Sequence, residues 1–591
     1  MNSKLSKYGL LAIFSLFLLS MGSGVAISTP VRSVPMAPTI EADPIPGETH
    51  IYNITSAEFP LDVALDQEGI AVTGTFAGSK IYLKILRDET SAELPANVFQ
   101  TGMFFTLGSD LDVTFQPNFP NYTDIPSTLR EITIPEGLAV PMGEQLSWVA
   151  GSGFWPENND SENEDDYFFI PFYAENFDIL AAVIESEGGT TIENSDSVLT
   201  VSWEDEDEGV SLEMTWRKTD GLLTKFSIEV TDGSQTIKGT AEHIGTEDRP
   251  LPSALSPGST HTFLVENAEL DIEVNDLLRS LLSGDQSDPD YEPFNEGTIE
   301  QEVNSMDGKT IMEFEVNSID GVFYNGTPKV YDPETDNLTT LASWVVIDGF
   351  TGNIWDASDD AYDDDSSSAL LQEEEEGPLD LPGFTTPAVT PDWEMWSGAV
   401  NGIGTLIGEE LLAFLRSSDF EDLLLEGMQG DEDSLPITNL DYKVDIGVEW
   451  TTENSVHYAS AFADFSGAVE VNDADSGLKV NVEVDAYATG WVAFQDSGIL
   501  AGAGVSGYGD VYGKMESGGL EGTAEGSVNV FEIKIKNTAV TGALDEPANP
   551  GGERHPEEDT AEDTSAISGF TFLWILLPLV FLPVFLRKRL K

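Results

Sequence analysis

The sequence contains no cysteine and only five histidines among its 591 residues. The first absence excludes disulfide bonds, thiolate metal sites and cysteine nucleophiles, and the second disfavours most zinc chemistry. Basic residues are also few, since 26 Lys and Arg stand against 106 Asp and Glu, for a formal net charge of −80. A body this acidic has no electrostatic basis for binding nucleic acid or lying flat on an anionic membrane.

Familiar catalytic signatures are missing as well. We find no G-x-S-x-G, no P-loop, no H-E-x-x-H and no G-x-G-x-x-G in a βαβ context. Paired carboxylates for glycoside hydrolysis carry no weight here, because among 106 acids some pair meets the required spacing by chance. The 40% hydrophobic content is nevertheless ample for packed cores, and the length suggests about two to four domains.

The N-terminus has the features of a secretory signal peptide over residues 1–26. Lys4 and Lys7 provide the basic region, residues 9–21 the apolar region, and residues 24–26 the small side chains for cleavage. An uncleaved N-terminal anchor is the alternative. Residues 27–45 are then expected to form a linker.

The C-terminus is expected to cross a membrane once. Residues 566–586 carry no charge, and a helix of 21 residues spans a hydrocarbon core of about 30 Å. The basic tail 587–591 follows directly, which places the C-terminus in the cytoplasm and the preceding chain outside. Residues 546–565, rich in Pro, Gly, Glu and Asp, are expected to form an acidic stalk. A buried core helix is the alternative for the apolar run.

Two related modules are predicted between these ends. The stretch 46–63 matches 257–274 without a gap, with seven of 18 residues identical, among them His50 and His261. Shorter similarities follow in the same order, including that of Trp216 to Trp491. We predict copy one at 46–245, a linker at 246–256, and copy two at 257–545 with a disordered acidic insertion at 358–377. Chance similarity between hairpins is the alternative.

The local patterns predict a mainly β (α+β) fold. Apolar residues alternate in Leu212, Met214 and Trp216 and again in Phe226, Ile228 and Val230, with a turn between. The runs 480–486 and 531–535 alternate in the same way. Helical spacing is confined to residues 405–428 and, more weakly, 177–185. Each module is therefore expected to be a large twisted antiparallel sheet with one or two helices, followed by the C-terminal transmembrane helix.

Candidate sites are few and each has a plainer interpretation. The acidic clusters 162–166, 204–208 and 359–365 suit loose Ca²⁺ binding, although none has the spacing of a calcium loop and a solvated acidic surface is favoured. The tryptophans Trp148, Trp155, Trp393 and Trp396 are either core residues or stacking platforms for sugars. No metal or cofactor is expected otherwise. Sequons for N-glycosylation begin at Asn53, Asn121, Asn159, Asn325 and Asn337.

The signal peptide, the cysteine-free acidic β-rich exterior, the sequons and the C-terminal anchor together resemble archaeal cell-surface proteins, S-layer-like or of the "choice-of-anchor" type. The Ser568-Gly569-Phe570 stretch before the apolar run is similar to the sorting anchors of that class, with Ser568 where Pro is usual. The resemblance implies a location at the cell surface rather than an activity.

We therefore expect a membrane-anchored extracellular glycoprotein with a binding, adhesion or cell-envelope role, no catalytic activity, and an extracellular protein or glycan partner. The first alternative is the binding of an apolar or sugar ligand on the concave face of a curved sheet. The second is an extracellular carbohydrate-active hydrolase, which would need convergent buried acids in a cleft.

Overall fold

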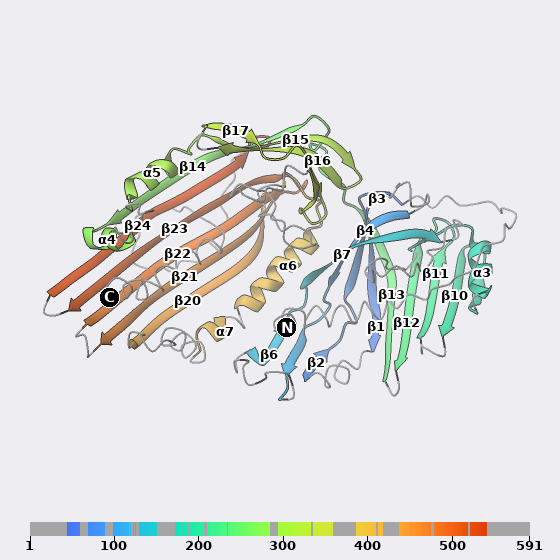
Figure 1. The fold of residues 1–591 in the computed structure, drawn as a ribbon. Coiled ribbons are helices and arrows are strands. Elements are labelled where there is room, and N and C mark those ends of the chain that lie inside the picture. Colours follow the sequence, from blue (N-terminus) through green and yellow to red (C-terminus); the bar gives the residue numbers. More distant parts are fainter. Residues whose placement is uncertain are drawn as a thin grey trace.

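The computed structural model shows a mainly β protein built from two large antiparallel sheets, each with helices along it (Figure 1). It describes residues 44–540 except 59–68, 89–97, several positions within 118–128, 151–171, 187, 206–209, 233–234, 284–293, 333–334, 359–385, 409–411, 418–436, 474–477 and 518–519. The signal peptide, almost all of the linker 27–45, the acidic stalk, the predicted span 566–586 and the basic tail lie outside these residues, as does the acidic insertion after Ser358. None of the helices within the described part of the chain combines the length and apolar character that a membrane crossing requires.

The N-terminal sheet has ten strands in the order β8-β7-β4-β3-β1-β13-β12-β11-β10-β9. Their bounds are β1 Glu48–Glu58, β3 Lys80–Asp88, β4 Val98–Thr106, β7 Ala139–Ala150, β8 Tyr173–Ala174, β9 Thr190–Asn194, β10 Val198–Asp205, β11 Val210–Arg217, β12 Leu223–Asp232 and β13 Gln235–Asp248. A small sheet joins β2 Ile70–Gly74, β5 Leu111–Phe115 and β6 Glu131–Ile134. Strand β13 pairs with β1 up to Asp248, three residues beyond the expected end of the first module.

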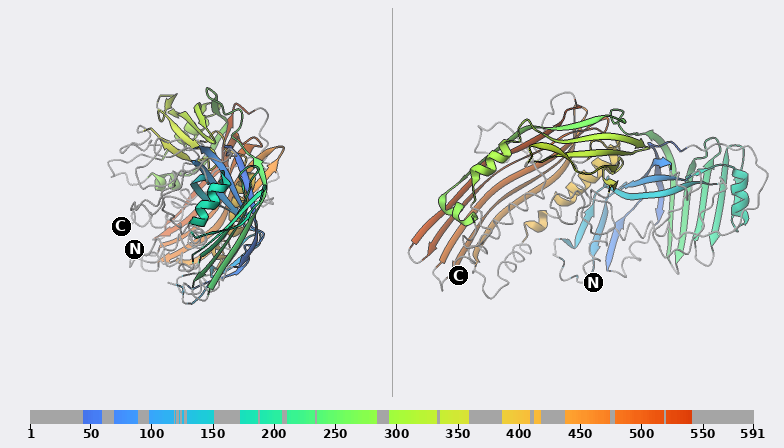
Figure 2. Two further views of the ribbon diagram at one scale, coloured as in Figure 1. Left: turned by 90° about the vertical axis from the view of Figure 1, so that its right-hand side faces the viewer. Right: turned by 45° about the horizontal axis from the view of Figure 1, so that its top comes forward.

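The C-terminal sheet follows the order β19-β18-β16-β15-β14-β24-β23-β22-β21-β20, with β17 added beside β16. Its bounds are β14 Thr260–Val274, β15 Thr310–Asp320, β16 Phe323–Asp332, β17 Asn337–Thr340, β18 Val345–Asp348, β19 Ile354–Ala357, β20 Ile437–Glu453, β21 Val456–Asp473, β22 Leu478–Gln495, β23 Leu500–Ser517 and β24 Leu520–Asn537. The five last strands form an up-and-down meander of long strands that curve together (Figure 2).

The two sheets share one plan of connections. In each, the first strand is central, the next strands are added on one side, and the last five strands return along the other side. The hairpins at Gly221 and Gly498 also match, because both glycines have positive φ and the residue after each forms an isolated bridge, Leu222 to Tyr173 and Ile499 to Ala388. Only a residue without Cβ adopts such a backbone conformation readily.

The strand register compares the positions of the residues matched between the two modules. His50 lies opposite Leu83 and His261 lies opposite Phe314, so the two histidines occupy corresponding positions on β1 and β14. Trp216 lies opposite Leu223, whereas the residue opposite Leu500 is Phe494. The expected equivalence of Trp216 with Trp491 is therefore wrong by three residues, because Trp491 lies opposite Gly504, farther from the turn than Trp216 is from its own.

The helices lie along the sheets. They are α3 Phe177–Ser186, α4 Asp276–Leu282, α5 Glu296–Asn304, α6 Trp393–Leu406 and α7 Leu412–Leu415. The predicted helix 177–185 is confirmed by α3. Of the predicted helix 405–428, the described residues contain only α7 and the last two residues of α6, which begins twelve residues earlier at Trp393; residues 409–411 and 418–428 lie outside the described part. Gly398 and Gly402 let α6 approach Ala139 and Leu138 so closely that a Cβ would collide with them.

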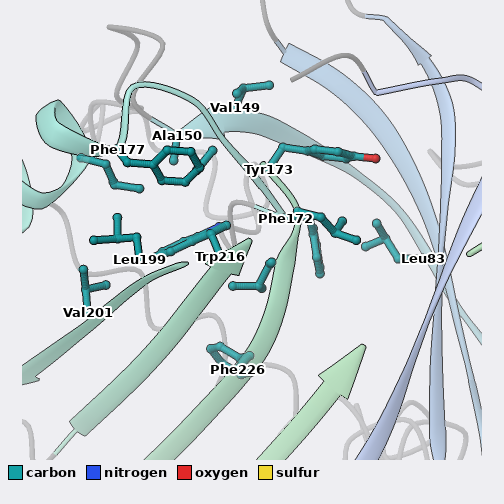
Figure 3. Packing of buried hydrophobic residues seen from close by; sticks show 14 of the residues in the cluster. Leu83, Val149, Ala150, Phe172, Tyr173, Phe177, Leu199, Val201, Trp216 and Phe226 are labelled. Carbon is teal, nitrogen blue, oxygen red and sulfur yellow. The ribbon is translucent and has the colours of Figure 1, made fainter. Parts of the chain in front are cut away.

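The core of the N-terminal sheet lies under α3 (Figure 3). Phe177 and Leu180 of the helix pack with Leu199, Val201 and the fully buried Trp216. The predicted hairpin is confirmed, since Leu212 pairs with Ile228 and Met214 with Phe226. Alternation therefore predicted both the strands and the face that they bury.

Candidate functional site

One face of the C-terminal sheet is apolar across six neighbouring strands. Residues that lie directly opposite each other on neighbouring strands point to the same face of the sheet. Val482 of β22 lies opposite Val469 of β21, and Ala486 lies opposite Phe465. On the other side, Val484 pairs with Val511, and Ile535 with Val265 of β14. Among the described positions of this face on β14 and β20–β24, the one charged residue is Asp473, at the hairpin end of β21 opposite Leu478. We call it the apolar face.

The opposite face of the same strands is polar except at one end, where Tyr458, Trp491 and Ala493 belong to a buried apolar cluster. Asp485 lies opposite Asp510 and Glu483 opposite Tyr512, while Tyr487 stacks on Tyr508 with ring centroids 5.6 Å apart. The Lys514–Glu516 ion pair is also on this side. A sheet that is polar on one face and nearly uncharged on the other turns the first to water and the second to apolar material.

Small residues line the centre of the apolar face. Ala463, Ala488 and Gly507 lie side by side on β21, β22 and β23, and the neighbouring row holds Ala486 and Gly509. With Ala461 they form what we call the small-residue strip. A methyl group added at Gly509 would meet Ala486 and the Asp485 carbonyl at 3.4 Å, which is ordinary contact within the sheet.

The described helices touch the apolar face at its two sides. On the β24 side, Leu277 and Leu278 of α4 reach Gly522 and Gly526. On the β20 side, Tyr442 donates a hydrogen bond to the Leu415 carbonyl of α7 at 2.8 Å. Helix α6 also covers the edge of β20, because Asn401 accepts from the Trp450 amide at 2.9 Å. Among the described segments, strands β21–β23 form the part of the apolar face that lies between these helices.

Polar side chains on the apolar face gather at one end. Apart from Tyr442, Trp450 and Asp473, the described polar positions are Thr452, His457, Asn537 and His261, all at the end where β14 and β21 begin. His457 bonds Thr452 at 2.9 Å and Asp496 at 2.8 Å, and Trp393 stacks on its ring at 4.2 Å. The Asn537 side chain donates to the Leu500 carbonyl at 2.9 Å. His261 is 1% exposed, and neither of its ring nitrogens has a partner among the described residues.

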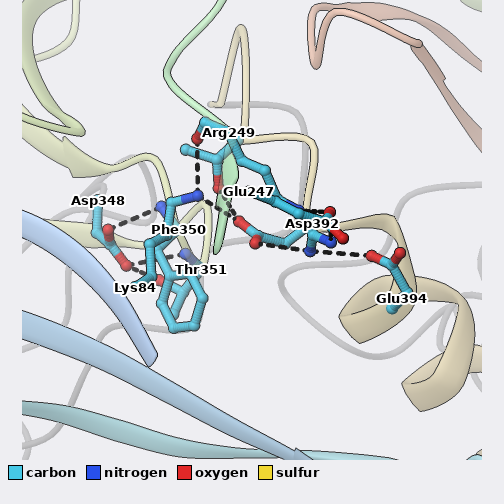
Figure 4. Close-up of polar contacts among 9 residues, drawn as sticks. Lys84, Glu247, Arg249, Asp348, Phe350, Thr351, Asp392 and Glu394 are labelled. Atoms are coloured by element: carbon cyan, nitrogen blue, oxygen red, sulfur yellow. Dashed lines mark hydrogen bonds and ion pairs between the residues drawn. The ribbon is translucent and has the colours of Figure 1, made fainter. Parts of the chain in front are cut away.

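A buried ionic network joins the two halves (Figure 4). Lys84 of β3 is fully buried and donates to Asp392 Oδ2 at 2.8 Å and to the Arg249 carbonyl at 2.7 Å. Arg249 reaches Asp392 at 3.3 Å and Glu394 at 2.9 Å. Burial lowers the pKa of Lys84, and the Asp392 carboxylate counteracts that effect. The network and the adjoining cluster of Tyr82, Phe104, Phe323, Phe350 and Met395 fix α6 and β16 against the first sheet.

A carboxyl pair lies at the same junction. Glu144 of β7 faces Asp348 of β18, and burial together with Asp348 raises the pKa of Glu144 to about 10. Asp348 already accepts from the amides of Phe350 and Thr351, each at 2.8 Å, and from the Thr351 hydroxyl at 2.5 Å. Gln100 donates to Glu144. These bonds hold the turn after β18 in place, so the pair has a structural explanation.

The histidine of the first half is fully partnered. His50 bonds the Tyr173 hydroxyl at 2.7 Å and the Thr246 hydroxyl at 3.0 Å, and His243 lies beside it with ring centroids 5.7 Å apart. Burial, and secondarily the nearby His243, lowers the pKa of His50 to about 4. This histidine is a buried neutral group that ties β1 to β8 and β13.

The sequons differ in accessibility. Asn337 is exposed on the four-residue β17, Asn53 and Asn325 are half-buried on β1 and β16, and Asn121 and Asn159 lie outside the described residues. The predicted acidic clusters fall almost entirely outside them too. Within the part that the structure describes, no group of three or more His, Cys, Asp or Glu side chains could hold a metal.

The predicted tryptophans are also divided. Trp393 belongs to the aromatic group at the polar end of the apolar face, and Trp396 packs into the junction cluster. Trp155 lies outside the described residues, and Trp148 is placed only by its backbone on β7. Sequence reasoning missed the apolar face as a unit, although the alternation in 480–486 and 531–535 was its signal.

Comparison with known proteins gives no family. No family model matches the chain, and no curated protein does. Among solved structures, Acinetobacter baumannii OccAB4 aligns at a TM-score of 0.08 and 6% identity, over 83% of this chain and 96% of that one. The transport unit of the autotransporter AIDA-I from Escherichia coli aligns at a TM-score of 0.07 and 7% identity, over 83% and 88%. Likeness this low carries no argument.

Proposed function

We propose that this protein is a membrane-anchored cell-surface protein that binds a hydrocarbon-containing ligand on the apolar face of its C-terminal sheet. The observation that carries the proposal is the near absence of charge from that face in a chain of net charge −80: among its described positions only Asp473, at a hairpin end, is charged, across six strands whose opposite face is rich in charged residues. If the 106 acidic residues were distributed at random, more of them would fall on this face. We therefore infer that the face contacts apolar material.

The shape of the floor favours a thin hydrocarbon chain as the occupant. The row of Ala463, Ala488 and Gly507 leaves a shallow strip about 10 Å wide over three strands, and Ala461, Ala486 and Gly509 in the adjacent rows extend it to roughly 14 Å along the strands, up to Val511. An extended acyl or alkyl chain has this form, whereas a helix with ordinary side chains is about 10 Å across. Each buried methylene contributes roughly 0.8 kcal/mol.

A binding role agrees better with the described carboxyl groups than a catalytic one. Asp348 and Asp392, the two most buried acids at the junction, accept hydrogen bonds from backbone amides or from cations of the fold. Both carboxyl groups thus make contacts that hold the fold together. We therefore propose no catalytic activity.

We also propose that the two sheets descend from a duplicated module and that residues 566–586 anchor them outside the membrane. The shared strand plan and the matching Gly221 and Gly498 hairpins support the first proposal. The apolar run with its basic tail supports the second. Protease treatment of intact cells tests the topology: the region before residue 546 should be digested, and its protection would contradict an outside location.

Ligand binding is tested with two variants that add the same ring to opposite faces. Gly509→Phe fills the small-residue strip, while Glu483→Phe adds a phenyl group to the exposed polar face of β22. We expect Gly509→Phe to weaken displacement of a fluorescent long-chain probe at least tenfold and Glu483→Phe to leave it unchanged. Both should melt as the wild type does. Equal probe binding by all three proteins would refute the proposal.

A further inference from the structure

An exposed tryptophan lies at the outer edge of the C-terminal sheet. Trp355 of β19 is 47% exposed, and it is the one exposed tryptophan within the part of the chain that the structure describes. It belongs to a β-bulge, since the pairing of β19 with β18 shifts register between Val346 and Ile347. Bulges at sheet edges turn a side chain in a direction that regular pairing would not give it. An indole that a bulge turns toward water can serve as a stacking surface.

The Trp355 ring is held in place by residues of both halves. It meets the Phe323 ring edge-on, with ring centroids 5.5 Å apart. The Arg87 guanidinium of β3 lies 4.3 Å from the centre of the Phe323 ring and 6.0 Å from that of Trp355. Arg87 is itself fixed, because its Nε donates to Gln100 at 2.9 Å. The orientation of Trp355 is therefore set in advance, which lowers the entropic cost of any contact that it makes.

A predicted glycosylation site lies in the same row of the sheet. Asn325 of β16 lies opposite Val346 of β18. Val346 in turn lies opposite Asp356, which shares the bulge with Trp355. Residues in one such row point to the same face, and neighbouring strands are about 4.8 Å apart. Asn325 and Trp355 are therefore roughly 10 Å apart on one face, with Val346 between them.

The Asn325 amide is oriented for modification. Asn325 is half-buried and begins the sequon Asn-Gly-Thr. Its Oδ1 accepts a hydrogen bond from Asn317 Nδ2 at 3.4 Å, and this bond does not use Asn325 Nδ2, the atom to which an N-linked sugar is attached. Trp344 is half-buried and precedes Val346 by two residues, so alternation places it on the same face. A sugar on Asn325 would thus have an indole ring on either side of Val346.

We propose that Asn325 carries a glycan whose first sugar ring packs over Val346 against the Trp355 indole. This inference rests on the outside location proposed above and not on ligand binding by the apolar face. One strand separates the two side chains, and a single sugar ring linked to Nδ2 is wide enough to bridge it. The C–H groups on one face of the sugar contact the apolar ring, while the hydroxyl groups remain in water. The contact covers apolar surface that is otherwise exposed.

The experiment is hydroxyl-radical footprinting of the full-length protein from its native host, read by peptide mass spectrometry. The Asn325 peptide should carry a glycan, and Trp355 should be oxidised several-fold more slowly in the wild type than in Asn325→Gln. Thr327→Val abolishes the same sequon but keeps Asn325, so it should behave as Asn325→Gln does. Asn337→Gln is the matched control, because it removes a sequon on β17 and should leave Trp355 as protected as in the wild type. Tyr512 of β23, 40% exposed, is the internal reference.

Two results would overturn the inference. One is an Asn325 peptide without a glycan. The other is equal oxidation of Trp355 in the wild type and in both variants of its sequon, which would show that the sugar does not cover the ring. Neither result concerns hydrocarbon binding, because the apolar face lies on β14 and β20–β24. Loss of probe binding or protection from protease would instead count against the proposed function.

Discussion

Replacing Lys84 with methionine should strongly destabilise the contact between the two halves. The Lys84 and Asp392 side chains are both fully buried, and the substitution keeps a long apolar stem but removes the ammonium group. Asp392 then retains only Arg249 at 3.3 Å and the Thr390 hydroxyl at 2.5 Å. Breaking a buried pair by removing one partner costs about 3–5 kcal/mol when a charge stays buried without compensation. Because Arg249 remains beside Asp392, we expect a loss at the lower end of that range.

The assay is urea unfolding followed by tryptophan fluorescence, with Lys238→Met as the control. Lys238 and Glu229 form an ion pair of similar length, 2.9 Å, but both side chains are more than two-fifths exposed. Exposed pairs contribute about 0–1 kcal/mol, so the control should change little. In Lys84→Met we also expect the connection between β13 and β14 to become more sensitive to proteolysis. Equal destabilisation by the two variants would refute the reasoning.

Three further predictions concern titration and glycosylation. The pKa of His50 is about 4 in the folded protein and 6.5 ordinarily, so between pH 6.5 and 4 only the unfolded chain protonates this histidine. The free energy of unfolding should therefore fall by up to about 3 kcal/mol as the pH drops through this range. In urea unfolding at a series of pH values, His50→Gln should remove this part of the pH dependence. In the folded protein Glu144 keeps a proton that the unfolded chain releases above about pH 4.5, so the free energy of unfolding should fall as the pH rises toward 10. Glu144→Gln can donate a hydrogen bond to Asp348 without taking up a proton, so this variant should be more stable than the wild type at pH 8 but not at pH 4. A variant less stable than the wild type at pH 8 would contradict this. In the native host, Asn337→Gln should remove one glycan from the mass of the protein, and an unchanged mass would contradict glycosylation at that exposed position.

The alternation of apolar and polar residues predicted much of the fold, because in a half-buried strand every second residue is buried and therefore apolar. The pairings of Leu212 with Ile228 and of Met214 with Phe226 follow from that pattern. The start of α6 could not be read in this way. Its glycines serve close packing on β6 and β7, which is a property of the neighbours and not of the local sequence.

The candidate site was less accessible to sequence reasoning for two physical reasons. Lys84 and Asp392 are 308 residues apart, so nothing local indicates that one neutralises the other. The nearly uncharged character of the apolar face emerges only once the register of six strands is known, because each strand alone resembles an ordinary amphipathic strand. The partners of His50 and the lack of partners at His261 are likewise tertiary facts.

Photocrosslinking tests the central claim most directly. A long-chain alcohol with a diazirine on its hydrocarbon chain would be added to the full-length protein, irradiated, and located by peptide mass spectrometry. We expect label on the peptides of β21, β22 and β23 that carry the small-residue strip, and much less on those peptides in Gly509→Phe. Label confined to the apolar run at 566–586 would show that the sheet does not hold the chain, and would contradict the account.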